Sequence, residues 1–173
     1  MKKIKLTCGL FALVDDDVYE ELNKHNWYSG GSKQHPYARR SKTINGKKIN
    51  IVMHRVIMGD PKGKEIDHKD HNTLNNQRSN LRICTRVQNS INTRTLSNNK
   101  SGYKGVIYAK ACTNRPWACS IGYRGKNIYG GAFPTKELAA AKYNELAKKY
   151  YGEFAYLNEI NTAINNLLEQ KGK

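Results

Sequence analysis

The sequence predicts an α+β fold: a β-rich N-terminal segment, then a short strand–loop–strand–helix motif, then a three-stranded antiparallel sheet packed on one helix. Three observations predict it. Short apolar runs of strand length are separated by turn residues such as Asn45-Gly46. Residues 135–151 carry apolar side chains at helical spacing. Residues 95–101 are small and polar throughout, which is typical of a linker.

The N-terminal part is expected to form strands at residues 4–6 and 10–14, followed by a short helix with an acidic cap. The buried side of that helix is predicted to carry Val18, Leu22 and Trp27. These elements provide the first apolar core of the chain.

A hairpin is predicted at residues 37–43 and 48–53, with its turn at Asn45-Gly46. Both strands alternate basic or polar residues with apolar ones, so one face of the ribbon is expected to be cationic. A short helix at residues 54–58 should follow.

The central motif consists of a strand at residues 65–68, a polar loop at 69–79 and a second strand at 81–84. Thr85 is expected to cap a helix that runs from residue 86 to about 92. The order is therefore strand, loop, strand, helix.

The C-terminal half predicts strands at residues 103–108, 117–123 and 126–132 and a helix at 135–151. A last short helix carries an apolar stripe that indicates a packing face or, alternatively, a dimer seam; its residues are Ile160, Ala163, Ile164, Leu167 and Leu168. The predicted domain bounds are 1–95 for the N-terminal sheet and central motif, 96–101 for a linker, 102–160 for the second domain and 161–173 for the tail.

The charge distribution points to a polyanionic partner. The formal net charge is +16, from 30 Lys and Arg against 14 Asp and Glu. Residues 30–58 and 71–136 contain no acid, whereas acids at Asp60, Glu65, Asp67 and Asp70 lie between these runs. A purely solvated surface normally mixes both signs, so long single-sign runs favour nucleic acid binding over a basic composition without function.

Cysteine usage and hydropathy limit the class of protein further. The four cysteines, Cys8, Cys84, Cys112 and Cys119, form no C-x-x-C pair, so structural zinc is not expected. No apolar run has the length of a membrane span, and no secretory signal is recognisable. We therefore expect a cytoplasmic protein without membrane contact.

Asp67-His68, followed by Asn80 and Asn89, is the most informative group of residues. A carboxylate supplies a metal ligand and an imidazole a general base, and amide side chains can complete the metal site and orient the imidazole. Together they can cut a phosphodiester with a hard divalent cation. Alone, Asp67-His68 could equally be a loop pair that hydrogen-bonds its own turn.

Residues 52–92 resemble the ββα-metal fold of HNH endonucleases, and specifically the phage- and intron-encoded homing group. The resemblance is carried by Ile66-Asp67-His68-Lys69-Asp70-His71-Asn72, then Asn75-Asn76, Asn80-Leu81-Arg82 and Gln88-Asn89. Several ordered matches over a short stretch make the signal specific. Many bacterial HNH nucleases also hold a structural zinc with cysteine pairs, which this chain lacks.

The resemblance implies a role for each matching residue. Asp67 and Asn89 would bind one Mg²⁺ or Mn²⁺, with no other cofactor. His68 would take the proton from the attacking water, and Asn80 would fix the His68 ring through a hydrogen bond. His54 would either contact phosphate or pack beneath the site.

Residues 101–158 resemble the ethylene-response-factor (AP-two) DNA-binding domain. The matching residues are Gly102-Tyr103-Lys104-Gly105-Val106, Trp117-Ala118, Gly131-Ala132-Phe133, Ala139-Ala140-Ala141-Lys142-Tyr143-Asn144 and Leu157-Asn158. The family lays its sheet in the major groove of DNA. Lys104 stands where the family uses an Arg, Gly105 would permit close approach, and Tyr129 replaces a DNA-contacting Trp.

These observations predict a site-specific, metal-dependent endonuclease that acts as a monomer on double-stranded DNA. The expected DNA-contacting residues are Arg39, Arg40, Lys48, His54, Arg55, Arg82, Lys104, Gly105, Lys110, Arg115, Tyr123, Arg124, Lys126 and Tyr129. Two alternatives remain open: a non-catalytic DNA-binding regulator and, since a basic sheet with aromatic residues can stack bases, an RNA-binding protein.

Overall fold

The computed structural model describes residues 1–95, 98–109 and 114–160. Contacts between Cα atoms divide the chain into two units, Met1–Ser90 and Ile91–Lys173, and each is described by itself. The mixed helices and small antiparallel sheets confirm the predicted α+β class. Within the described residues, no helix has the length and apolar character needed to cross a membrane.

The first unit begins with strands β1 (Lys2–Lys5) and β2 (Phe11–Val14), which pair antiparallel, and helix α1 (Asp16–Asn23). Trp27 is fully buried as predicted, and its indole nitrogen donates to the carbonyl of Leu22 at the end of the helix. Strand β3 (Tyr28–Gly31) was not predicted, because two of its four residues are glycines and little alternation is visible.

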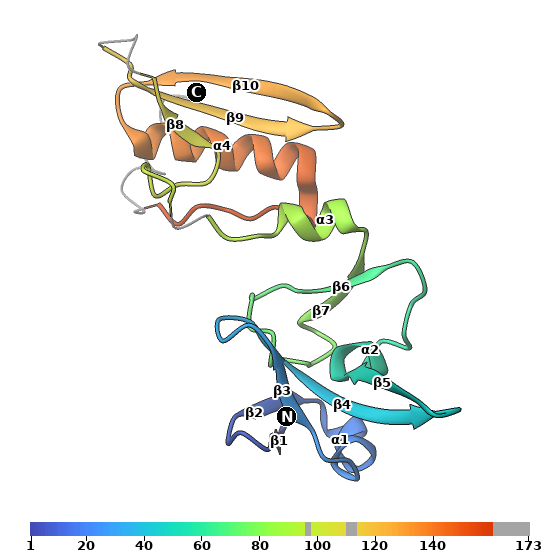
Figure 1. Ribbon diagram of the computed structural model, residues 1–173. Coiled ribbons are helices and arrows are strands. Elements are labelled where there is room, and N and C mark those ends of the chain that lie inside the picture. Colours follow the sequence, from blue (N-terminus) through green and yellow to red (C-terminus); the bar gives the residue numbers. More distant parts are fainter. Residues whose placement is uncertain (96–97, 110–113, 161–173) are drawn as a thin grey trace. The chain divides into compact units, whose positions relative to one another are not determined.

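Strands β4 (Pro36–Ile44) and β5 (Lys47–Val52) form the predicted hairpin, and β3 pairs on the other side of β4 (Figure 1). Asn45 and Gly46 both have positive φ, of 49° and 73°, as a tight hairpin turn requires. Helix α2 (Met53–Ile57) follows directly, and the fully buried Met53 joins the apolar core of this unit.

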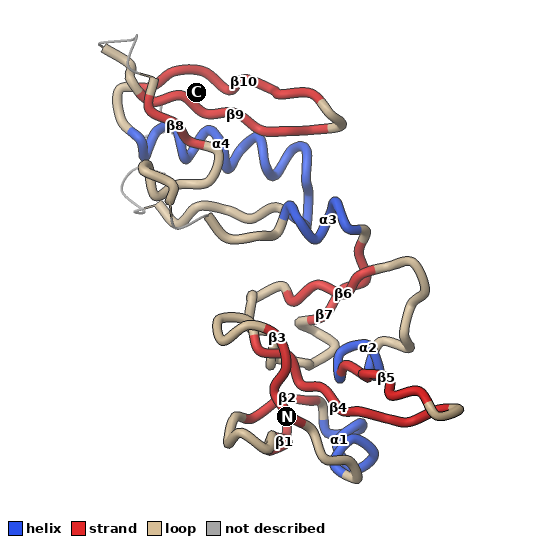
Figure 2. Tube along the Cα trace, viewed as in Figure 1, coloured by secondary structure: helices blue, strands red, loops and turns tan. Residues whose placement is uncertain are grey.

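Strands β6 (Glu65–His68) and β7 (Leu81–Cys84) pair antiparallel, and helix α3 (Arg86–Ile91) follows β7. This is the predicted order of strand, loop, strand and helix, and Figure 2 shows the long loop that joins the two strands. The loop is hydrogen-bonded to β2: Leu13 N–H donates to the Leu74 carbonyl, and Asn76 N–H donates to the Leu13 carbonyl.

The core of the first unit joins residues from the N-terminal strands, α1, β4, α2 and the β6–β7 loop: Ile4, Leu6, Ala12, Val14, Leu22, Trp27, Ala38, Met53 and Leu74. Asp15 adds a polar tie, since its carboxylate accepts the backbone N–H of Arg78 at 2.8 Å. The N-terminal segment therefore supports the loop between β6 and β7. The cysteines of the described residues are free thiols.

The second unit contains β8 (Val106–Tyr108), β9 (Trp117–Tyr123) and β10 (Lys126–Phe133), paired antiparallel in the order β10-β9-β8. Helix α4 (Lys136–Tyr151) lies along one face of this sheet, and a short 3-10 turn (Gly152–Phe154) follows it (Figure 1). Thr135 caps the helix by accepting the Leu138 N–H. The predicted three strands and one helix are present, with β8 shorter than expected.

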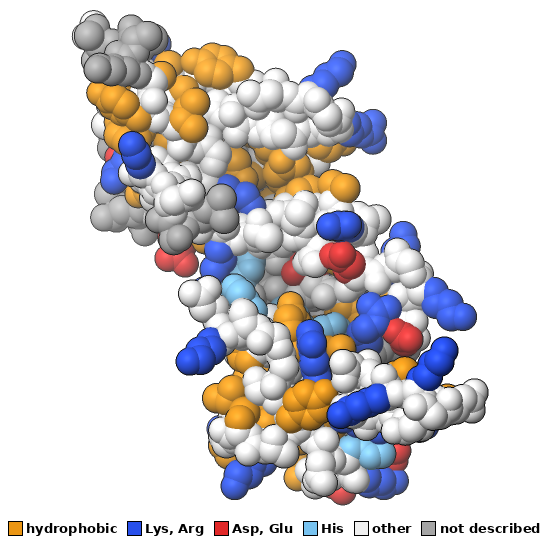
Figure 3. Space-filling view, viewed as in Figure 1, with side chains coloured by type: hydrophobic (Ala, Val, Ile, Leu, Met, Phe, Trp, Pro, Cys, Tyr) orange, Lys and Arg blue, Asp and Glu red, His pale blue; other side chains and the backbone are white. Residues whose placement is uncertain are grey.

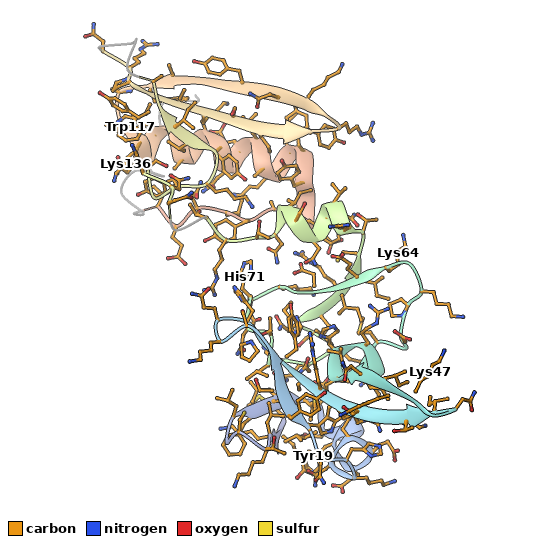
Figure 4. All side chains as sticks on the ribbon, viewed as in Figure 1. Tyr19, Lys47, Lys64, His71, Trp117 and Lys136 are labelled. Atoms are coloured by element: carbon orange, nitrogen blue, oxygen red, sulfur yellow. The ribbon has the colours of Figure 1, made fainter. Side chains whose placement is uncertain are left out.

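Small residues allow the helix to lie close to the sheet. Ala139, Ala140 and Ala147 are fully buried and pack with Val106 and Cys119. Figure 4 labels Trp117 at the start of β9 and Lys136 at the start of α4. The predicted C-terminal helix at 161–173 and part of the predicted linker lie outside the described residues.

Candidate active site on the β6–β7 pair

Asp67 and His68 close strand β6, as the sequence predicted, and both are buried. Side chains alternate along a strand, so Glu65 and Asp67 share one face while Ile66 and His68 share the other. The facing residue of Asp67 on β7 is Arg82, and that of Glu65 is Cys84. One face of the pair is therefore polar and charged.

The Asp67 carboxylate is held by Arg82. Arg82 Nε and Nη2 lie 2.8 and 2.6 Å from Asp67 Oδ2, and the two side chains are only 10% and 7% exposed. A buried carboxylate requires a positive partner, because its desolvation is costly. Arg82 supplies that charge, a role that was not expected from the sequence.

Asn89 reaches the same face of β6 from helix α3. Its amide Nδ2 donates to Glu65 Oε2 at 2.6 Å. Thr85 and Gln88 form a reciprocal capping box at the start of this helix, and thereby fix the turn on which Asn89 lies. Since Glu65 and Asp67 are two residues apart on one strand, Asn89 is brought to the face that carries the Asp67 carboxylate.

The donors on this face fit a hard divalent cation. They are the carboxylates of Asp67 and Glu65 and the amide oxygen of Asn89, and oxygen is the donor that Mg²⁺ and Mn²⁺ prefer. The buried Asp67 already takes a positive partner there. Within the described part of the chain, no group of three or more His, Cys, Asp or Glu side chains is placed to hold a metal ion.

His68 lies in a cluster of aromatic rings. The rings of His54 and His68 have centroids 5.1 Å apart in an edge-on arrangement, and Tyr37 lies 5.4 Å from His54 and 6.0 Å from His68. Burial lowers the pKa of His68, although hydrogen bonding to Asn76 and the nearby Asp70 and Asp67 charges act in the opposite direction. The ring is therefore neutral at pH 7 and can accept a proton.

His54 packs beneath the site. Its side chain is buried against the rings of Tyr37 and His68. Burial, with the neighbouring His68 as the next cause, lowers the pKa of His54 to about 3. Of the two alternatives left open by the sequence, this geometry favours packing over a phosphate contact, since the uncharged buried ring offers an anion little attraction.

Asn80 holds the loop between the two strands. Its Nδ2 donates to Asp70 Oδ1 and to the Asn75 carbonyl, and its Oδ1 accepts the Asp70 N–H. Burial would raise the pKa of Asp70, but hydrogen bonds from Asn75, Asn72 and Asn80 hold that pKa below its usual value. Asn80 was expected to hydrogen-bond the His68 ring, but the residue in contact with His68 Nε2 is Asn76, through its Oδ1 at 3.2 Å.

The basic residues of the first unit have different surroundings. The guanidinium groups of Arg39 and Arg40 lie over the rings of Tyr37 and Trp27, whereas Lys48 is exposed on β5. Arg55 is bound to Asp60 and to the carbonyls of Pro61 and Lys64, so it ties α2 to the following turn. Figure 3 shows Lys and Arg side chains over the visible face of this unit, with few acids between them. Figure 4 places Lys47 at the tip of the β4–β5 hairpin.

In the second unit, two expected DNA contacts have structural roles. Lys104 Nζ donates to the carbonyls of Ile91 and Thr93, and burial lowers its pKa to about 8. Gly105 has a φ of +70°, and a Cβ there would lie 2.1 Å from the ring of Tyr143. Gly105 is therefore required for packing against α4, independently of any approach to DNA.

The remaining candidates of the second unit lie at the surface of its sheet or its turns. Arg115, Arg124 and Lys126 are exposed, Tyr129 is 65% exposed on β10, and Tyr123 is half-buried beneath the guanidinium of Arg124. Lys110 lies outside the described residues. These side chains could reach a polyanion.

Three residues near His68 and Asp67 were missed by the sequence analysis as site residues: Tyr37, Glu65 and Asn76. Tyr37 and Asn76 contact His68 from a distant strand and from the loop, and Glu65 contacts Asn89. Only Glu65 carried a usable signal, because its position two residues before Asp67 places it on the same strand face.

Comparison with known proteins agrees with this geometry. The HNH endonuclease family pattern matches residues 59–91, which include β6, β7 and α3. A protein of Acanthamoeba polyphaga mimivirus named "Uncharacterized HNH endonuclease L560" is 34% identical over 161 residues, covering 88% of this chain and 76% of the relative. "Protein 3.8" of Escherichia phage T7 is 34% identical over 95 residues, covering 55% of this chain and 76% of the relative.

No solved structure matches the chain at a significant level. These comparisons do not test the resemblance of residues 101–158 to the ethylene-response-factor domain, which stays a prediction. The family pattern falls on the β6–β7–α3 unit that carries Asp67, His68 and Asn89, and the mimivirus relative extends the similarity over most of the sequence. The chain therefore belongs to the HNH endonuclease family.

Proposed function

We propose that this protein is a site-specific endonuclease of the homing type that hydrolyses phosphodiester bonds in double-stranded DNA with a single divalent cation, Mg²⁺ or Mn²⁺. The observation that carries the proposal is the buried His68 ring next to the buried Asp67 carboxylate at the end of β6. Asn89 reaches the Asp67 face of that strand through its hydrogen bond to Glu65. A proton acceptor and oxygen ligands on adjacent residues are what metal-assisted phosphodiester hydrolysis requires.

Asp67 and Asn89 are the residues that would hold the cation, and Glu65 accepts the Asn89 Nδ2–H, so that the amide oxygen would remain as the ligand atom. When bound, the cation supplies Lewis-acid stabilisation of the charge on the phosphate and on the leaving oxygen. Arg82 holds the Asp67 carboxylate through two N–H groups, and this guanidinium would add positive charge beside a phosphate bound at the site.

His68 is the proposed general base, which takes the proton from the attacking water. Its lowered pKa keeps the ring neutral at pH 7, as this role requires. Asn80 and Asp70 brace the loop that returns from β6 to β7, and so keep the end of β6 in place. Their role is to hold the backbone around His68.

The proposed DNA contacts lie in both units. In the first, the exposed basic residues of the β4–β5 hairpin, Lys42, Lys47 and Lys48, suit phosphate contacts. In the second, Arg115, Arg124, Lys126 and Tyr129 on the β8–β9–β10 sheet and its turns support a docking role like that of the ethylene-response-factor sheet. The net charge of +16 supports both.

Conversion of supercoiled plasmid to nicked or linear DNA tests the proposal. We expect product with Mg²⁺, none with EDTA, and none with His68→Ala in Mg²⁺. His35→Ala is the matched control, because His35 is exposed and its loss should leave cleavage unchanged. Full cleavage by His68→Ala would overturn the mechanism. DNA binding without cleavage on any plasmid would favour a regulator, and preference for RNA in competition would favour the RNA-binding alternative.

A further inference from the structure

Arg39 on strand β4 is a half-buried arginine whose charge is not used within the protein. Its Nε atom is buried and has no hydrogen-bond partner within the described residues. Arg55, Arg78 and Arg82 of the same unit are each paired with a carboxylate, whereas Arg39 forms no ion pair in the described part of the chain. A buried donor without an acceptor is destabilising, so it calls for an acceptor from outside the protein.

The alternation of side chains along β4 places Arg39 on the sheet face that leads to His68. Tyr37 and Arg39 are two residues apart and therefore share one face. The guanidinium carbon of Arg39 lies 5.8 Å from the centre of the Tyr37 ring, and the ring centres of Tyr37 and His68 are 6.0 Å apart.

The electrostatics of Tyr37 agree with this placement. Burial raises the pKa of Tyr37, and the positive charge of Arg39 opposes this rise. The carboxylates of Asp67 and Glu65 act in the same direction as burial. Tyr37 is therefore close enough to interact both with Arg39 and with the carboxylates of the candidate active site.

A glycine on the neighbouring strand makes room for the Arg39 side chain. Gly30 of β3 pairs with Tyr37, so a side chain at position 30 would lie on the same sheet face as Arg39. A Cβ at Gly30 would lie 2.7 Å from Cδ of Arg39 and 3.3 Å from its Nε. The side chain of Arg39 therefore lies across Gly30, with its guanidinium near the Tyr37 ring.

Arg40 shows that the unpartnered nitrogen alone does not identify a binding residue. Its Nε is also buried without a partner among the residues that the structure describes. Arg40 follows Arg39 on β4, so its side chain lies on the opposite face, with its guanidinium carbon 5.5 Å from the ring of the buried Trp27. What distinguishes Arg39 is its place beside Tyr37.

A guanidinium that is already oriented suits a phosphate, because its planar set of donors matches two phosphate oxygens. We propose that Arg39 binds a backbone phosphate of the DNA close to the phosphate cleaved at His68, and that Gly30 and Tyr37 hold the guanidinium in position for this contact. The inference rests on the proposed nuclease function, which identifies the polyanion as DNA.

Binding of a fluorescent DNA duplex of mixed sequence to the whole protein tests this contact. The titrations are done in EDTA, so that no strand is cut, and at several salt concentrations. For Arg39→Gln we expect weaker binding and a slope of log K against log salt that is smaller by about 0.9, as for one lost phosphate contact. Arg78→Gln is the matched control, because Arg78 is exposed and paired with Asp17, and it should keep the wild-type affinity and slope.

Gly30→Ala displaces the guanidinium without changing the charge of the protein. Gly30 does not have a positive φ, so its backbone accepts alanine, but the new Cβ forces the Arg39 side chain to move. Affinity and slope should therefore fall as in Arg39→Gln. The double variant Gly30→Ala/Arg39→Gln should bind like Arg39→Gln alone, because the effect of Gly30 acts through Arg39.

Circular dichroism confirms that each variant is folded. If Arg39→Gln does not fold, Arg39→Lys keeps the charge and the aliphatic chain but not the planar donor set, and it should bind DNA less tightly than wild type. Equal losses of affinity in Arg39→Gln and Arg78→Gln would overturn the proposal, as would wild-type affinity in a folded Gly30→Ala.

The same titrations separate this inference from the nuclease function. Binding that depends on Arg39 in a protein that cuts no plasmid would support the phosphate contact and contradict only the proposed cleavage. Plasmid cleavage by a protein whose DNA affinity is unaffected by Arg39→Gln would contradict the contact and leave the nuclease function standing.

Discussion

Arg82 and Asp67 face each other across the β6–β7 pair, and the guanidinium donates from both Nε and Nη2 to one carboxylate oxygen. The proposed metal ligand thus has a cationic partner supplied by the protein itself. A divalent cation must compete with this guanidinium for Asp67 or share the carboxylate with it. At the proposed cation site, this pair would link the free energy of unfolding to the affinity for the cation.

Replacement of Arg82 by Met should destabilise the metal-free protein. It leaves the Asp67 carboxylate buried without its guanidinium, which typically costs about 3–5 kcal/mol of the free energy of unfolding. Denaturant unfolding in EDTA measures this loss. Addition of Mg²⁺ should recover part of it, because a cation that binds only the folded state raises the free energy of unfolding.

The matched control is Arg78→Met. Arg78 also pairs with a carboxylate, that of Asp17, but the two side chains are 46% and 62% exposed. An exposed pair contributes about 0–1 kcal/mol. Equal losses of the free energy of unfolding in the two variants would show that the buried Arg82–Asp67 pair stabilises the protein no more than the exposed pair does.

His54 should make the first unit sensitive to acid. Its pKa is about 3 in the folded protein against 6.5 ordinarily, with burial as the main cause. Between pH 6.5 and 3 the unfolded chain binds the extra proton, so the free energy of unfolding falls as pH falls, by up to about 1.4 kcal/mol per pH unit. His54→Phe keeps a ring against Tyr37 and His68 and should reduce this dependence.

Urea unfolding of wild type and His54→Phe at pH 7 and pH 5 checks this prediction. The exposed His35→Phe is the control and should keep the wild-type dependence on pH. If wild type and His54→Phe lose the same free energy of unfolding on acidification, another group is responsible.

Gly105→Ala should destabilise the second unit far more than Gly102→Ala. Both glycines have positive φ, of 70° and 76°, so both substitutions strain the backbone by roughly 1 kcal/mol or more. Only at Gly105 would the new Cβ meet the Tyr143 ring and the Ser120 carbonyl, whereas nothing lies within 4 Å of the position at Gly102. The added overpacking should cost about 1–3 kcal/mol more.

Thermal unfolding of the two glycine variants provides the comparison, with circular dichroism to confirm the folded state. Similar melting temperatures would mean that α4 moves away from the sheet at little cost. Weaker DNA binding by a Gly105→Ala protein of unchanged melting temperature would instead support the close approach to DNA that the sequence suggested.

Lys48→Ala should weaken DNA binding through the loss of a phosphate contact. If Lys48 contacts one phosphate, the slope of log K against log salt should decrease by about 0.9. Titration of a DNA duplex at several salt concentrations gives this slope. Lys24→Ala is the control, because Lys24 is paired with Glu21 at 2.6 Å, and it should leave the slope unchanged. Identical slopes for Lys48→Ala and wild type would place the hairpin away from the DNA.

Local sequence patterns were sufficient for most of the fold. The Asn45-Gly46 hairpin, the strands around Asp67-His68 and the long helix α4 were predicted because each is specified by neighbouring residues. Strand β3 was missed, because Tyr28–Gly31 becomes a strand by pairing with β4 and carries little strand pattern of its own.

The sequence by itself determined that a carboxylate and an imidazole close one strand, and that amide residues follow in the next loop and helix. It could not determine which asparagine of that loop contacts His68, because Asn72, Asn75, Asn76 and Asn80 are chemically equivalent in a sequence. The tertiary structure decided this, because β2 binds the loop backbone at Leu13 and turns the Asn76 amide towards the ring. Residue type is local information, whereas the contact of a side chain depends on packing between segments far apart in the chain.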